Sequence, residues 1–178
     1  MCDSVGAFPS GPNASAPVYA AFFLGQGGYV FSMGIASLAR QAHARGIEAD
    51  VYAYTEVDRA RTNVGMKRGR GCKTALIGYS LGCTTATYLA QLAPSTDLVC
   101  CIAESSLGAN HPIDKAKTKR SVLFTGPDFL SDAGEHDAFD RVVPVDVLPI
   151  PIFAHLSLQF APTVVNGVLA ELAKLKGN

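Results

Sequence analysis

Residues 78–82, Gly-Tyr-Ser-Leu-Gly, form a G-x-S-x-G motif whose serine could act as a nucleophile. The motif lies between the apolar segment 74–77 and a pattern of helical spacing that begins at Cys83. In this context the serine occupies a sharp turn that raises its hydroxyl above a sheet, and the flanking glycines let neighbouring backbone pass closely. We therefore interpret Ser80 as a nucleophile for acyl transfer. The Leu81 N–H, at the start of the next helix, would face the developing oxyanion.

A serine hydroxyl needs a general base that removes its proton, and the chain has four histidines. His155, in Phe-Ala-His-Leu-Ser at 153–157, follows the last predicted strand and is expected in a loop. His43 is expected on the surface of a helix, and His136 lies between two acidic residues in a predicted turn. His111 lies in a loop, and nothing in its setting requires a place in the site. We predict that His155 is the base.

A carboxylate must hold the imidazole in the correct tautomer and stabilise the imidazolium. Asp128, in Thr-Gly-Pro-Asp, stands directly beyond the fifth predicted strand. Asp132 and Asp137 in the same loop, and Asp146 near the end of the sixth predicted strand, are alternatives. Asp128 is the predicted third member of a Ser-His-Asp triad.

The elements that must position these residues alternate along the chain. Apolar runs predict strands at 17–24, 47–54, 74–77, 97–103, 121–125 and 141–147. Helical spacing predicts helices at 29–45, 83–92 and 159–174, and the polar segment 56–70 is ambiguous but compatible with a short helix. This alternation predicts an α/β fold, a three-layer sandwich around a mostly parallel sheet of about six strands in the order 2-1-3-4-5-6.

Ligands of such sheets bind beyond the carboxyl ends of the strands. The glycine turn at 25–28, the turn with Ser80 and the loop after Thr125 all lie at that end. With 178 residues and 18.7 kDa, the chain is expected to form one domain, residues 17–178, after a loose leader at 1–16.

The order Ser80, Asp128, His155 resembles that of the α/β-hydrolase superfamily, and the chain looks like a small, lidless member, similar to serine esterases, lipases or thioesterases. The resemblance rests on the segments 18–28, 75–89 and 121–172. It implies that Gln26 provides the first oxyanion-hole donor and Leu81 the second. Leu24 stands where many members carry histidine, so Gly27 is an alternative donor.

The resemblance implies a serine hydrolase that cleaves a carboxylic ester or thioester through an acyl-serine intermediate, with no cofactor and no metal. Apolar residues around the motif favour a small-molecule or acyl-chain ester; they are Tyr79, Leu81, Phe129, Leu130 and Leu156. An acyltransferase using the same serine, a serine–aspartate dyad without His155, and a hydrolase-shaped binding protein without turnover are the alternatives.

Composition bears on the other function classes. Fifteen basic and fifteen acidic residues give a net charge of zero, which disfavours a nucleic-acid-binding protein. The basic runs at 67–73 and 115–120 have no interleaved aromatic residues, so we predict no nucleic acid partner. Five cysteines without C-x-x-C spacing favour reduced, buried thiols and a cytoplasmic location, and no apolar stretch is expected to span a membrane.

Overall fold

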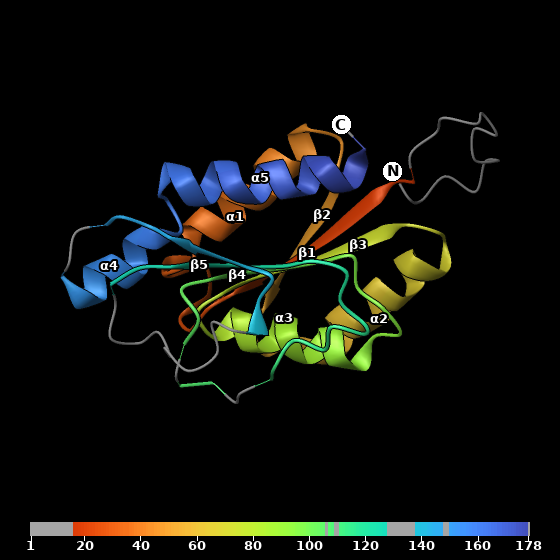
Figure 1. The fold of residues 1–178 in the computed structure, drawn as a ribbon, viewed down its shortest axis with the longest axis horizontal. Helices are drawn as coiled ribbons and strands as arrows, with labels where there is room; N and C mark the ends of the chain where they lie inside the picture. Colours follow the sequence, from red (N-terminus) through yellow and green to blue (C-terminus); the bar gives the residue numbers. More distant parts are fainter. Residues whose placement is uncertain (1–15, 106, 109–110, 128–137, 148–149, 178) are drawn as a thin grey trace.

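Six parallel strands form the sheet at the centre of the part of the protein that the computed structural model describes, which comprises residues 16–105, 107–108, 111–127, 138–147 and 150–177 (Figure 1). The strand order, β2-β1-β3-β4-β5-β6, confirms the predicted one. The strands are β1 (Val18–Leu24), β2 (Glu48–Ala53), β3 (Lys73–Tyr79), β4 (Leu98–Ile102), β5 (Ser121–Thr125) and β6 (Arg141–Pro144).

Helices cover both faces of this sheet. In chain order they are the 3₁₀ helix η1 (Gly28–Val30), α1 (Met33–Ala44), α2 (Val57–Gly69), α3 (Leu81–Leu92), α4 (Pro151–Leu158) and α5 (Pro162–Lys176). Helices α1 and α5 lie on one face, and α2 and α3 lie on the other (Figure 1). The predicted three-layer α/β sandwich is therefore confirmed.

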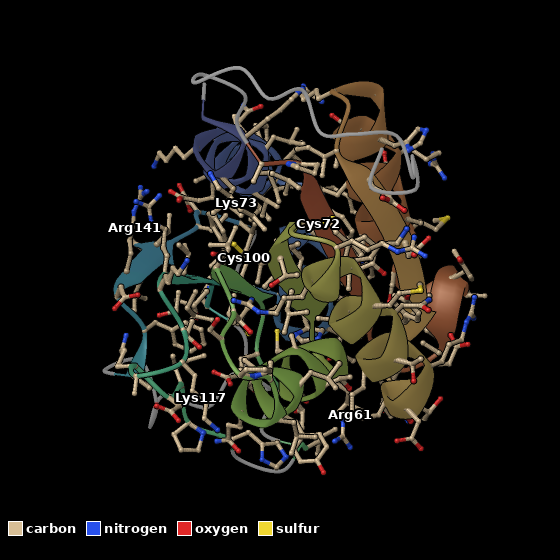
Figure 2. All side chains as sticks on the ribbon, turned by 90° about the vertical axis from the view of Figure 1, so that its right-hand side faces the viewer. Arg61, Cys72, Lys73, Cys100, Lys117 and Arg141 are labelled. Carbon is tan, nitrogen blue, oxygen red and sulfur yellow. The ribbon has the colours of Figure 1, made fainter. Side chains whose placement is uncertain are left out.

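The strands read as continuous apolar runs because both of their faces are buried. In β1, Phe22 packs in the core on the α1–α5 side, and its neighbour Phe23 packs in the core on the α2–α3 side. Cys100 and Cys101 of β4 divide between the two cores in the same way. Both thiols are free and fully buried, and Figure 2 shows Cys100 in the interior. Together with the buried, free Cys83, they are the small core residues that we predicted.

One cysteine departs from the prediction. Cys72, which precedes β3, is disulfide-bonded, and the spacing of the cysteines gave no sign of this. Not all of the thiols of this chain are therefore reduced in the structure.

Two helical predictions had the right position but the wrong boundaries. The expected helix 29–45 is divided into η1 and α1, because the chain turns at Ser32, whose hydroxyl accepts a hydrogen bond from the Gly25 N–H at 3.0 Å. The closing helix begins at Pro162 rather than at residue 159, and proline suits the first turn of a helix because it has no N–H to leave unpaired. The ambiguous segment 56–70 forms α2.

The sequence analysis expected no apolar stretch long enough to span a membrane. The segment Ile152–Lys176 is nevertheless long and apolar enough to do so, judged by its length and mean hydropathy alone. In the structure it comprises most of α4 and α5, which are separated by residues 159–161. Val164, Val168 and Leu172 of α5 are fully buried in the core against the sheet. This packing accounts for the apolar character of α5.

Candidate active site

Ser80 occupies the turn between β3 and α3 in a strained backbone conformation. Its φ of 53° and ψ of −125° are rarely adopted by a residue with a side chain. Its N–H donates to the Ile102 carbonyl of β4 at 3.0 Å, and its carbonyl accepts from the Cys83 N–H at 2.9 Å. Such strain costs about 1–3 kcal/mol and persists only where surrounding structure maintains it, as it commonly does at functional sites.

Glycines make this turn possible because other backbone lies against them. A Cβ on Gly78 would come within 2.3 Å of the Gly82 carbonyl oxygen. A Cβ on Gly82 would come equally close, 2.3 Å, to the Phe23 carbonyl oxygen of β1. The sequence analysis inferred that both glycines of the motif allow neighbouring backbone to pass closely. The structure shows this close approach at both positions.

His155 lies in helix α4, and the expectation that a loop would carry it is wrong. Pro151 at the first position of α4 starts the helix soon after β6. The His155 side chain is buried, and its ring lies 5.3 Å from that of Tyr79, measured between ring centroids. The Tyr79 hydroxyl donates to the His155 carbonyl at 3.1 Å. This hydrogen bond connects α4 to Tyr79, the residue that directly precedes Ser80.

Ser80 and His155 line the same cavity, at the carboxyl ends of the strands. Its volume is about 570 Å³, within the usual range for sites that bind small molecules. The other lining residues are mostly apolar; they are Gln26, Gly27, Phe31, Tyr79, Ser105, Leu107, Ile152 and Leu156. The structure therefore brings together the predicted nucleophile, the predicted base and the first predicted oxyanion donor.

The predicted oxyanion donors come from two different turns. The Gly28 N–H donates to the Gly25 carbonyl at 3.2 Å, which closes a turn with Gln26 and Gly27 at its centre. Gly27 has φ 78° and ψ 4°, the values of the third residue in a type II turn, and its Cα lies against the Phe31 ring. Leu81 is the first residue of α3, where backbone N–H groups have no acceptor within the helix. Its side chain lines a neighbouring hollow instead.

Gln159 was missed by the sequence-based reasoning, which placed it at the start of the closing helix. It follows α4 and is almost completely buried. Its Nε2 donates to the Phe31 carbonyl at 2.6 Å, and its Oε1 accepts from the Gly34 N–H at 2.9 Å. The residue therefore joins the helix of His155 to the segment that follows the turn with Gln26 and Gly27. No sequence signal identified it, because its partners lie far away along the chain.

The structure describes two acidic residues that are candidates for the carboxylate, Asp146 and Glu104. Asp128, Asp132 and Asp137 lie outside the described residues, as do Phe129, Leu130 and His136. Asp146 is exposed and lines a hollow other than the one with Ser80. The structure adds Glu104, which follows β4, the strand beside β3, and has a buried Oε2. Its neighbour Ser105 lines the cavity.

The remaining described histidines lie away from this cavity. His43 is exposed near the end of α1. The His111 ring lies 4.9 Å from that of Tyr88, and both residues line a separate hollow beside α3. Among the described residues, no three His, Cys, Asp or Glu side chains gather as a metal site would require.

The basic runs lie at the opposite end of the sheet from Ser80. Lys73 begins β3, the strand that ends before Ser80, and Figure 2 views this end with Lys73 and Lys117 labelled. The Lys73 Nζ donates to the Leu175 carbonyl at 2.6 Å, and the Lys117 Nζ donates to the Gln91 carbonyl at 2.7 Å. These lysines connect elements of the fold to one another.

Comparisons with known proteins bear on the fold of this chain. No model of a known protein family matches the sequence, and no curated protein matches it significantly. A solved structure from Xanthomonas campestris pv. campestris, described as a hydrolase of the α/β superfamily, superposes with a TM-score of 0.63 at 16% identity, covering 89% of this chain and 97% of that one. An esterase domain of a Rhodothermus marinus protein gives a TM-score of 0.56 at 15% identity, covering 88% and 90%.

A type II thioesterase from the yersiniabactin biosynthetic pathway gives a TM-score of 0.57 at 9% identity, covering 94% of this chain and 97% of the thioesterase. These identities are low, so the superpositions bear on the fold alone. The strand order, the strained serine turn after β3 and these similar structures together show that the chain has the α/β-hydrolase fold.

Proposed function

We propose that this protein is a serine hydrolase that cleaves carboxylic esters or thioesters through an acyl-Ser80 intermediate. The observation that carries the proposal is the strained Ser80 turn in one cavity with the buried His155. A strained serine that ends a strand and begins a helix presents its hydroxyl to substrate, which an ordinary connection would not require. The esterase domain and the thioesterase among the similar structures support the same reaction class.

In the proposed reaction, His155 removes the proton of the Ser80 hydroxyl as Oγ attacks the acyl carbon. The N–H groups of Gln26 and Leu81 stabilise the negative charge that develops on the carbonyl oxygen. The bond to the alcohol or thiol breaks, and His155 protonates this leaving group. His155 then removes a proton from water, which attacks the acyl-serine, releases the carboxylic acid and restores Ser80. We propose Asp128 as the carboxylate that orients His155.

The cavity favours an apolar acyl group. Phe31, Leu107, Ile152 and Leu156 contribute apolar surface to its lining. An apolar group gains free energy by leaving water for such a surface, whereas a charged one loses it. The reaction needs no resident metal or organic cofactor, because the chain supplies the nucleophile, the base and the oxyanion donors.

The test is hydrolysis of p-nitrophenyl acetate by the parent protein, Ser80→Ala and the matched control Ser37→Ala, whose serine lies on α1 outside the cavity. We expect kcat to fall by about a thousandfold or more in Ser80→Ala, because loss of the nucleophile leaves only binding and oxyanion stabilisation. Ser37→Ala should match the parent. Equal rates for Ser80→Ala and the parent would refute the proposal.

The three alternatives to this proposal have separate signatures. An acyltransferase would form acyl-Ser80 but turn over faster when a non-water acceptor is added. A binding protein without turnover would bind the ester and release no p-nitrophenol. The serine–aspartate dyad would retain much of its activity in His155→Ala.

A further inference from the structure

Helix α4 separates the cavity of Ser80 from a second apolar hollow. This second hollow, which we call the α4 groove, has a volume of about 710 Å³. It is lined by Asp146, Val147, Ile150, Phe153, Leu156, Ser157, Phe160, Ala161 and Pro162. Leu156 lines both hollows, so a single side chain marks the place where they adjoin.

The residues of α4 divide between the two hollows as helical geometry requires. Successive residues turn by about 100°, so Ile152 and His155 share one side of the helix, and Phe153 and Ser157 share another. The first pair lines the cavity and the second pair lines the α4 groove. Around the helix, Leu156 lies between the side that faces the cavity and the side that faces the α4 groove. The two hollows therefore adjoin along α4 at Leu156.

The α4 groove presents large apolar side chains to solvent. Phe153 is 65% exposed, Ile150 52% and Phe160 51%. Asp146 is its one charged lining residue among those described. Exposed apolar surface of this kind, next to a candidate catalytic cavity, is typical of a binding site. Its volume lies within the range of small-molecule sites, and none of the described lining residues is basic, which disfavours an anionic occupant.

We propose that the α4 groove binds the distal part of a long acyl chain whose carbonyl carbon lies at Ser80, which makes medium- and long-chain acyl esters or thioesters the preferred substrates. This inference rests on the proposed function. Because the α4 groove adjoins the cavity of Ser80 at Leu156 and its lining is largely apolar, the substrate's own acyl chain is the favoured occupant. Burial of one methylene contributes about 0.8 kcal/mol, so each methylene that reaches the α4 groove should raise kcat/KM about fourfold.

The experiment measures kcat/KM for p-nitrophenyl acetate, butyrate, octanoate and decanoate, each below its critical micelle concentration. The readout is the decanoate-to-acetate ratio within each protein. In Phe153→Asp and Phe160→Asp we expect this ratio to fall about tenfold or more, because the carboxylate disfavours an apolar chain beside it. Both positions are exposed, and an aspartate in the first turn of α4 is compatible with the helix dipole.

The matched control is Met66→Asp. Met66 is an exposed apolar residue of α2, which lies on the face of the sheet opposite α1 and α5. It should keep the parent ratio. A ratio near one in the parent, or a parent-like ratio in both groove variants, would overturn the inference while acetate hydrolysis still supported the proposed function. If the parent did not hydrolyse the acetate ester, both the inference and the proposed function would be overturned.

A second copy of this chain is the other occupant to test. Sedimentation of the parent and Phe153→Asp distinguishes it. A dimer that dissociates in Phe153→Asp, with an unchanged chain-length ratio, would show that the α4 groove is an interface and would overturn the inference. A parent and a variant in the same oligomeric state, with a reduced ratio in the variant, support the acyl chain as occupant.

Discussion

Gln159 accepts a hydrogen bond from the Gly34 N–H at 2.9 Å, across 125 positions of sequence. The contact is close, since a Cβ on Gly34 would lie 2.7 Å from the Gln159 side chain. The same side chain donates to the Phe31 carbonyl. His155 lies one helical turn before Gln159. The turn with Gln26, the first proposed oxyanion donor, lies shortly before Phe31. One buried amide therefore joins the helix of the proposed base to the segment that follows the first proposed oxyanion donor, Gln26.

Replacement of this amide should reduce catalytic activity while the protein remains folded. In Gln159→Leu we expect kcat/KM for p-nitrophenyl acetate to fall about tenfold or more, because small displacements of catalytic groups have large effects on rate. The fall should appear mainly in kcat. The control is Gln91→Leu, which removes a hydrogen bond to the Pro112 carbonyl away from the cavity. Parent-like kcat in a folded Gln159→Leu would contradict the positioning role.

The two glycines of the serine turn should not tolerate a methyl group. Gly78→Ala and Gly82→Ala each place a Cβ 2.3 Å from a backbone oxygen, so we expect a loss of several kcal/mol in the free energy of unfolding, or failure to fold. Gly65→Ala is the control: it lies in α2 with no neighbouring atom within 4 Å, and should stabilise by about 0.5–1 kcal/mol. Urea denaturation measures all three. Stable Gly78→Ala and Gly82→Ala proteins would contradict the close approach.

Asp97 should make the stability of the protein depend on acid pH. Burial alone would raise its pKa, but hydrogen bonds from Lys119 and the Thr74 N–H, with the charges of Lys119 and Arg68, outweigh burial and hold the pKa below the ordinary value of 3.8. The carboxylate therefore stabilises the fold above the unfolded-state pKa, and this stabilisation is lost as pH falls through the lower folded-state pKa.

The measurement is urea denaturation of the parent and Asp97→Asn between pH 7 and pH 3. We expect Asp97→Asn to cost about 1–3 kcal/mol near neutral pH, because the buried Thr74 N–H and the Lys119 ammonium lose a charged acceptor. The difference between the two proteins should narrow as the parent carboxylate becomes protonated. A difference that stays constant or widens below pH 4 would show that Asp97 does not carry this dependence.

Five carboxylates compete for the role of orienting His155, and substitution to the amide separates them. We expect Asp128→Asn to lower kcat by about 10³–10⁴-fold, because an amide favours the wrong imidazole tautomer. Asp132→Asn, Asp137→Asn and Asp146→Asn should stay within a few-fold of the parent. Glu104→Gln tests the carboxylate that the structure adds beyond β4. The largest loss of kcat in any protein other than Asp128→Asn would assign the role elsewhere.

Local patterns were sufficient to predict the sheet. The buried strands show as apolar runs, and the G-x-S-x-G motif between a strand and a helix predicted the turn at Ser80, since strained turns of this kind depend on nearby glycines. The helical setting of His155 was missed, because a loop was expected to follow β6 directly, whereas Pro151 begins α4. Contacts between distant segments, such as that of Gln159, leave no local pattern. The α4 groove was missed because it is built around α4, a helix that the sequence-based prediction did not include.

The most direct test of the account is covalent labelling with a fluorophosphonate, followed by mass spectrometry of the intact protein and of its peptides. We predict one adduct per parent chain, located on Ser80, none on Ser80→Ala, and formation at least about a hundredfold slower in His155→Ala, because the base no longer removes the serine proton. An unlabelled parent, or an adduct that persists in Ser80→Ala, would contradict the central claim that Ser80 is a nucleophile activated by His155.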